Sequence, residues 1–224
     1  MLNENVMVFL QDNLDFWPHL SADQQSNVIA HTSIARFTKG QTMHRGDQNC
    51  MGLIMIRSGL LRVYMLSEEG KDITLFRLVP GELCLLSASC ILNQITFDVH
   101  IDVEDTCELV SVSSHILSDL MTDNIYVENF IYKRLVDRFS DVMWAMEQIL
   151  FMSFDKRLAI FLVDEMSKTH STTLRLTHEQ IAKYIGSARE VVTRMLKYFS
   201  NEGIVELSRG GITIINPTKL KSLL

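Results

Sequence analysis

Residues 177–200 read THEQIAKYIGSAREVVTRMLKYFS, and this stretch decides the fold of the C-terminal part of the chain. Thr177 begins a capping-box pattern, which predicts a short first helix. Gly186 then permits a tight turn, and Ser187 with Glu190 forms a second capping-box pattern that starts another helix. Two helices joined by about three residues are typical of a helix-turn-helix.

The second helix has one apolar side and one polar side. At 3.6 residues per turn, its Val, Met, Leu and Phe residues share one side and must pack on a neighbouring element. The opposite stripe offers the hydrogen-bond donors and acceptor that base edges in a major groove require. This stripe consists of Arg189, Glu190, Thr193, Arg194 and Lys197.

Two apolar runs follow the second helix. Gly203 suits a helix C-terminal cap, and residues 204–207 and 212–215 predict two short strands joined by a turn at 208–211. A helix-turn-helix followed by such a hairpin is a winged helix-turn-helix.

Residues 185–196, IGSAREVVTRML, resemble the recognition helix of the Crp/Fnr family of bacterial transcription regulators, and the similarity extends over nearly the whole chain. The resemblance implies that Arg189, Glu190 and Arg194 contact the bases of a TGTGA-type half-site. It also implies that Thr193 and Lys197 contact bases or phosphates. Thr177 and Ser187 would cap helix ends that face phosphates, and His178 joins them as a candidate DNA-binding residue.

Charge is distributed unevenly along the 224 residues, whose net charge is -6. Residues 154–224 hold 11 Lys and Arg against 7 Asp and Glu, whereas residues 1–153 hold 10 against 20. The part that contains the helix-turn-helix is therefore the basic one, as DNA binding requires. Neither a secretory leader nor an apolar run of about 18 residues is visible, so we expect a cytoplasmic protein without membrane contact.

Short apolar runs between residues 35 and 112 alternate with turn signals such as Ser58-Gly59 and Pro80-Gly81. This spacing predicts a compact barrel or roll of short strands. The order of the glycines resembles the cyclic-nucleotide-binding β-roll of the same family. The expected fold class is α+β, with an N-terminal double-stranded β-roll of jelly-roll type, a long dimerisation helix and a C-terminal winged helix-turn-helix. The expected domains are residues 1–123, 124–153 and 154–224.

From Asn124 the apolar period becomes helical for about 30 residues. Such a helix either packs within its own domain or pairs with a second chain as a coiled coil. Because the Crp/Fnr family, which this chain resembles, uses this helix for dimerisation, we expect a homodimer. Its two recognition helices would lie about one DNA turn, roughly 34 Å, apart. The expected a and d positions are Tyr132, Leu135, Phe139, Val142, Met146 and Ile149.

The resemblance places an effector site near the turn at Pro80-Gly81. In relatives that bind cyclic AMP, Gly-Glu-Leu is followed about ten residues later by Arg and Ser/Thr, which hold the cyclic phosphate. Here no Lys or Arg occurs between Arg77 and Lys133, so a buried phosphodiester would have no cationic side chain from its own pocket. We therefore expect an effector other than cyclic AMP. The sequence leaves open which effector this is and whether the chain uses a cofactor. The candidate effector-binding residues are Gly81, Glu82, Leu83, Cys84, Ser87 and Cys90.

Three interpretations of the sensor half remain open. Cys84 and Cys90 flank the expected phosphate position, so the chain could respond to oxidants or to a metal; buried structural thiols are the alternative. The roll could also be a ligand-free scaffold of a constitutive DNA binder.

The histidines show no metal-ligand spacing, and no catalytic motif indicates an enzyme. The expected partners are double-stranded DNA, a second copy of the chain, RNA polymerase and a small-molecule effector.

Overall fold

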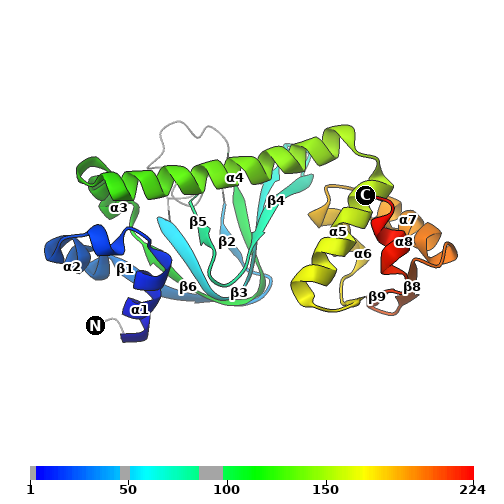
Figure 1. Ribbon diagram of the computed structural model, residues 1–224, viewed down its shortest axis with the longest axis horizontal. Helices are drawn as coiled ribbons and strands as arrows, with labels where there is room; N and C mark the ends of the chain where they lie inside the picture. The colour runs from blue at the N-terminus through cyan, green and yellow to red at the C-terminus, as the bar shows by residue number, and fades with distance from the viewer. Residues whose placement is uncertain (1–3, 46–50, 86–97) are drawn as a thin grey trace. The chain divides into compact units, whose positions relative to one another are not determined.

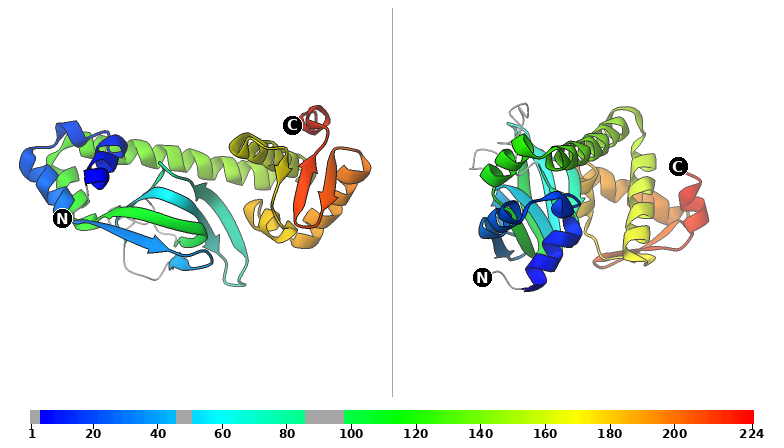
Figure 2. Two further views of the ribbon diagram at one scale, coloured as in Figure 1. Left: turned by 90° about the horizontal axis from the view of Figure 1, so that it is seen from below. Right: turned by 60° about the vertical axis from the view of Figure 1, so that its left-hand side comes forward.

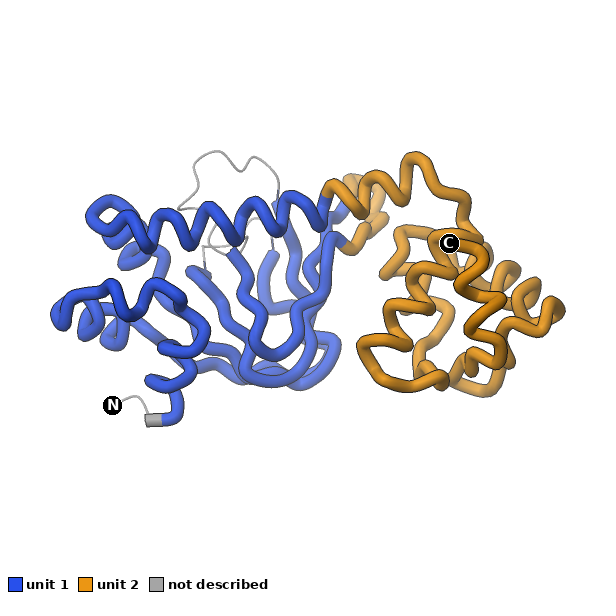
Figure 3. Tube along the Cα trace, viewed as in Figure 1, with its two compact units in different colours: residues 1–66, 75–142 blue, residues 67–74, 143–224 orange. Residues whose placement is uncertain are grey.

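The computed structural model describes residues 4–45, 51–85 and 98–224. Its contacts divide the chain into two compact units (Figure 3). The first comprises residues 1–66 and 75–142, and the second residues 67–74 and 143–224. The three domains expected from the sequence are defined by their expected functions rather than by contacts, and that division stays a prediction.

The first unit is built on an antiparallel β-roll (Figure 1). Strands β1, β6, β3 and β4 lie in this order, β2 pairs with β6, and β5 pairs with β3. The two long strands β3 and β6 form the spine. The bounds are β1 Thr32–Phe37, β2 Thr42–His44, β3 Leu53–Leu66, β4 Asp72–Leu78, β5 Leu83–Cys84 and β6 His100–Val112.

The prediction of a turn at Ser58-Gly59 was wrong, because β3 continues through it. The ladder between β3 and β6 shifts its register on both sides of Ser58, which marks a bulge. Gly59 has φ +93°, and a Cβ there would lie 2.5 Å from the Cβ of Cys107 on β6. The glycine therefore allows a close approach of two strands.

Helices close one end of the roll. Ser21 caps α2 through a full capping box with Gln24. The rings of Phe16 and Phe130 meet edge to face with centroids 5.1 Å apart. Both views in Figure 2 show α1, α2 and α3 gathered at this end. The bounds are α1 Glu4–Asn13, the 3-10 helix η1 Trp17–His19, α2 Ala22–Ala30 and α3 Ser114–Asp123.

Glu108 on β6 joins two strands through ion pairs. It lies 2.6 Å from Arg36 Nε on β1 and 2.5 Å from Arg57 Nη1 on β3. The hydrogen bond from Arg36 and the charges of both guanidinium groups hold the pKa of Glu108 below its ordinary value.

The long helix predicted from Asn124 is α4, Ile125–Phe151. Val127, Phe130 and Ile131 are buried against the first unit, and Leu135 packs on the same core. The expected seam was therefore wrong at Leu135, which faces the chain's own core. Exposed apolar side chains recur instead at alternating intervals of four and three residues: Tyr132, Val136, Phe139, Met143, Met146 and Leu150.

The second unit has its own core and a three-stranded sheet in the order β7-β9-β8 within the described residues. Its fully buried side chains include Leu158, Ile181, Val192, Leu196 and Phe199. In the part of the chain that the structure describes, no helix is long and apolar enough to span a bilayer. The bounds are α5 Phe154–Thr169, β7 Thr173–Leu174, α6 His178–Tyr184, α7 Arg189–Asn201, β8 Val205–Ser208, β9 Gly211–Ile214 and α8 Pro217–Lys221.

Candidate nucleic-acid interface and pocket of the roll

Helix α6 begins with the predicted capping box. The Thr177 hydroxyl accepts a hydrogen bond from Gln180 N–H at 3.1 Å, and Gln180 Oε1 accepts one from Thr177 N–H at 2.9 Å. Two backbone donors that a helix start would leave without partners are thereby satisfied. The box fixes where α6 starts and places His178 in its first turn.

The turn between α6 and α7 is held by its glycine and by a side chain from α5. Gly186 has φ +60°, a left-handed conformation that favours glycine. The guanidinium of Arg157 donates to the carbonyl of Ile185 at 2.6 Å and to that of Gly186 at 3.4 Å. Burial lowers the pKa of Arg157 from its ordinary value. These contacts satisfy carbonyls at the end of α6 and fix the direction in which α7 leaves the turn.

The prediction that Ser187 caps the second helix was wrong. The N-cap is Ala188, and α7 begins at Arg189. The Ser187 N–H instead donates to the Ala182 carbonyl at 2.9 Å, which closes the end of α6. Ser187 thus belongs to the turn.

Helix α7 buries one side and exposes the predicted polar stripe. Val192, Leu196 and Phe199 are fully buried in the core of the second unit. On the other side, the side chains that lie exposed are Arg189, Glu190, Thr193, Arg194 and Lys197. The exposed face therefore presents three cations, a carboxylate and a hydroxyl on one rigid helix.

His178 and Thr193 make a contact that the sequence analysis did not anticipate. His178 Nδ1 lies 2.9 Å from Thr193 Oγ1, which also donates to the Arg189 carbonyl at 2.9 Å. Partial burial and then the charge of Arg189 lower the pKa of His178. The contact links the first turn of α6 to the exposed face of α7.

An open groove of about 470 Å³ adjoins this face. The start of α6 forms one wall through Thr177, His178 and Glu179, and Arg189 of α7 contributes to the lining. The turn between β8 and β9 forms another wall through Ser208 and Gly210. Strands β8 and β9 form the predicted wing, paired from Val205↔Ile214 to Ser208↔Gly211.

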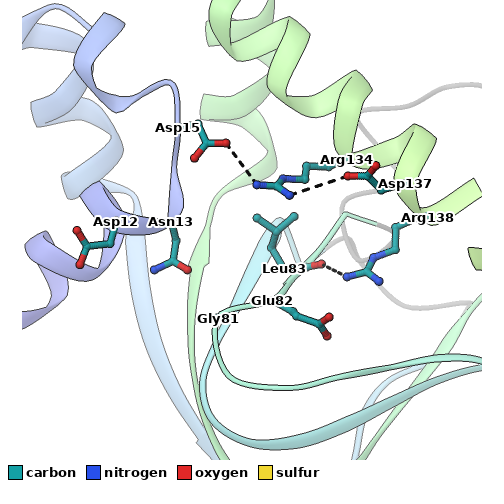
Figure 4. A pocket seen from close by; sticks show the side chains of 9 residues that line it. All are labelled: Asp12, Asn13, Asp15, Gly81, Glu82, Leu83, Arg134, Asp137 and Arg138. Atoms are coloured by element: carbon teal, nitrogen blue, oxygen red, sulfur yellow. Dashed lines mark hydrogen bonds and ion pairs between the residues drawn. The ribbon is translucent and has the colours of Figure 1, made fainter. Parts of the chain in front are cut away.

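Gly81, Glu82 and Leu83 line a second pocket, of about 350 Å³, in the first unit (Figure 4). Glu82 accepts a hydrogen bond from Val79 N–H at 3.0 Å, and Leu83 is buried. Cys84 follows on β5 and is fully buried. Candidate residues Ser87 and Cys90 lie outside the described residues, so a response through Cys84 and Cys90 stays a prediction.

Helix α4 supplies the two arginines that line this pocket. Arg138 donates to the Leu83 carbonyl at 3.4 Å and lies 2.9 Å from Asp141 (the Leu83 bond is drawn in Figure 4). Arg134 pairs with Asp15 at 3.3 Å and approaches Asp137 at 3.9 Å. The residues lining the pocket include four carboxylates, Asp12, Asp15, Glu82 and Asp137, beside these two arginines.

Over the described ranges 4–45, 51–85 and 98–224, no group of three or more His, Cys, Asp and Glu residues is arranged to hold a metal ion.

Comparisons with known proteins agree with this combination of roll, long helix and winged helix-turn-helix. Residues 156–223 match the Crp-like helix-turn-helix domain. A solved structure described as a transcriptional regulator of the Crp/Fnr family from Eubacterium rectale is 43% identical, with a TM-score of 0.90 over 95% of this chain and 98% of that one. The anaerobic regulatory protein of Haemophilus influenzae is 27% identical over 86% of this chain and 76% of that protein.

A more distant solved structure shares the fold. The c-di-GMP responsive global regulator CLP of Xanthomonas campestris is 18% identical, with a TM-score of 0.75 over 88% of this chain and 100% of that one. Identity and coverage with the Eubacterium rectale protein are high enough to decide the family. This chain, which carries the exposed polar stripe on α7, belongs to the Crp/Fnr family of transcription regulators.

Proposed function

We propose that this regulator binds a TGTGA-like palindrome as a homodimer. The observation that carries the proposal is the exposed stripe on α7, because arginine reads guanine and glutamate accepts from cytosine in the major groove. Arg189, Glu190 and Arg194 are assigned to base edges. Thr193 and Lys197 are assigned to a base or a phosphate.

Dimerisation is proposed to use the seam of α4 from Tyr132 to Leu150. Its six apolar side chains are exposed in the single chain and have heptad spacing. A two-fold dimer presents two copies of α7 to successive turns of one face of the duplex, which explains why the site would be a palindrome. RNA polymerase is the further partner that we propose for such a regulator.

The effector is proposed to bind the pocket around Glu82 and to differ from cyclic AMP. Both arginines of the pocket already face carboxylates, and carboxylates outnumber them. The charged side chains around a bound phosphodiester would therefore carry a net negative charge, which disfavours binding of this anion. Calorimetric titration tests this: cyclic AMP should release no binding heat, and saturable binding that strengthens DNA affinity would contradict the proposal.

DNA recognition is tested by selecting duplexes from a random pool with the purified chain, followed by measurements on the selected site. Arg194→Ala should cost roughly 1–3 kcal/mol on that site and relax the preference at one base pair. Lys197→Ala should weaken selected and random duplexes alike and reduce the salt slope by about 1. Equal losses of Arg194→Ala on selected and random DNA would argue against base reading.

A further inference from the structure

The hydroxyl of Thr193 makes two hydrogen bonds within the protein. A threonine hydroxyl carries one proton and two lone pairs. Thr193 Oγ1 lies 2.9 Å from the Arg189 carbonyl, and a carbonyl can only accept. The single proton of Thr193 must therefore point at Arg189, back along its own helix.

This assignment fixes the role of His178. Its Nδ1 lies 2.9 Å from the same hydroxyl oxygen, whose proton is already used. Nδ1 must then donate, so the neutral imidazole carries its hydrogen on Nδ1 rather than on Nε2. A protonated ring also carries a hydrogen on Nδ1. The contact therefore has one direction in both protonation states.

From this hydrogen-bond chain we infer that His178 is a specificity-determining positioning residue, which acts on base reading through Thr193. The inference rests on the proposed function, in which the exposed face of α7 enters the major groove. With its proton and one lone pair engaged, Thr193 offers the groove one remaining lone pair and its methyl group. It cannot donate.

The remaining lone pair and the methyl group of Thr193 determine which bases it can contact favourably. Adenine and cytosine present an amino group in the major groove, and thymine presents a methyl group. Guanine presents two acceptors there, N7 and O6, which need a donor that Thr193 lacks. Thr193 should therefore favour an amino edge or a thymine methyl over guanine at the base that it faces.

The hydrogen bond also holds the side chain in place. Threonine in a helix divides between two χ1 rotamers because its hydroxyl can bond the preceding turn. The bond to Arg189 selects the rotamer, and the hydrogen bond from His178 to the same oxygen stabilises that rotamer further. Without that second bond the side chain changes rotamer more readily, and a hydroxyl that has left the Arg189 carbonyl can donate to a guanine acceptor.

The test measures base preference by competition between half-sites that carry each of the four bases at every position. Thr193→Ala first identifies the position that Thr193 reads. His178→Ala should then reduce discrimination against guanine at that position by about 2- to 10-fold, the worth of one hydrogen bond. His178→Asn should restore most of it, because the asparagine amide can donate from nearly the place of Nδ1. Lys168→Ala, on α5, is the control.

The tautomer gives a second measurement that does not depend on DNA. Nitrogen-15 spectra of the free protein at neutral pH should show the proton of His178 on Nδ1. A proton on Nε2 would overturn the inference, as would a His178→Ala variant that loses affinity equally for all four bases. So would a failure of Thr193→Ala to change any base preference. A wild-type chain that prefers no sequence would instead refute the proposed function as a whole.

Discussion

One substitution on α4, Phe139→Ala, tests the proposed dimer. Phe139 is 65% exposed in the single chain. Fully burying a phenylalanine side chain is worth roughly 1.5–3 kcal/mol. If the seam closes against a second copy, about two thirds of this value, roughly 1–2 kcal/mol, is gained there. A two-fold interface contains the residue twice, so its loss should weaken the dimer by about 2–4 kcal/mol.

This loss corresponds to a dimer Kd that rises roughly 30- to 700-fold, at 1.4 kcal/mol for each factor of ten. Sedimentation equilibrium over a wide concentration range measures it directly. Ile34→Ala is the matched control, because Ile34 on β1 is also an exposed apolar side chain but lies off the seam. An unchanged Kd for Phe139→Ala, or a wild-type chain that stays monomeric, would refute the reasoning.

The same variant separates association from folding. Since much of the Phe139 side chain is exposed in the single chain, its removal should barely change the thermal midpoint of the monomer. At concentrations where the wild type is dimeric, the two midpoints should diverge, because association stabilises only the folded state. A lower midpoint at every concentration would indicate a folding defect instead.

Three further predictions concern local structure. Thr177→Ala removes the cap of α6 and should lower stability by about 0.5–2 kcal/mol, measured as a shift of the urea midpoint by circular dichroism; no shift would contradict the capping role. Gly186→Ala should cost about 1–2 kcal/mol through its left-handed backbone, in the same assay, and a neutral result would contradict that conformation. Glu108→Gln should be less stable than wild type at pH 7, since Arg36 and Arg57 depress the pKa of Glu108. That contribution exists above the unfolded pKa and is lost as pH falls through the folded one, so the difference should shrink below about pH 4; a constant difference would refute it.

The helix-turn-helix could be predicted from sequence because its signals are local. A capping box and a glycine act over three or four residues, and both were confirmed at Thr177 and Gly186. Ser187 shows the limit of such signals. Its pattern with Glu190 satisfies the sequence rule, but the Ser187 N–H bonds back to α6, and the next helix starts later.

Non-local contacts account for the remaining differences. Gly59 looked like a turn because its close approach to Cys107 on another strand leaves no trace in the local pattern. On α4 two apolar stripes lie side by side, and periodicity alone cannot say that Leu135 faces the chain's own core while Val136 stays exposed. The hydrogen bond between His178 and a residue 15 positions away was invisible for the same reason.

The later start of α7 also changes what its first turn can offer to DNA. The first N–H groups of any α-helix lack an intrahelical acceptor, and the helix dipole makes this end positive. A serine cap would have engaged one of these donors, but Ala188 has no side-chain oxygen, and the first helical residue is Arg189. If α7 enters the groove as proposed, the backbone donors of Arg189 and Glu190 approach the duplex together with the Arg189 guanidinium. The absent cap therefore leaves the positive end of the helix available to a phosphate, which a capping serine would have partly occupied.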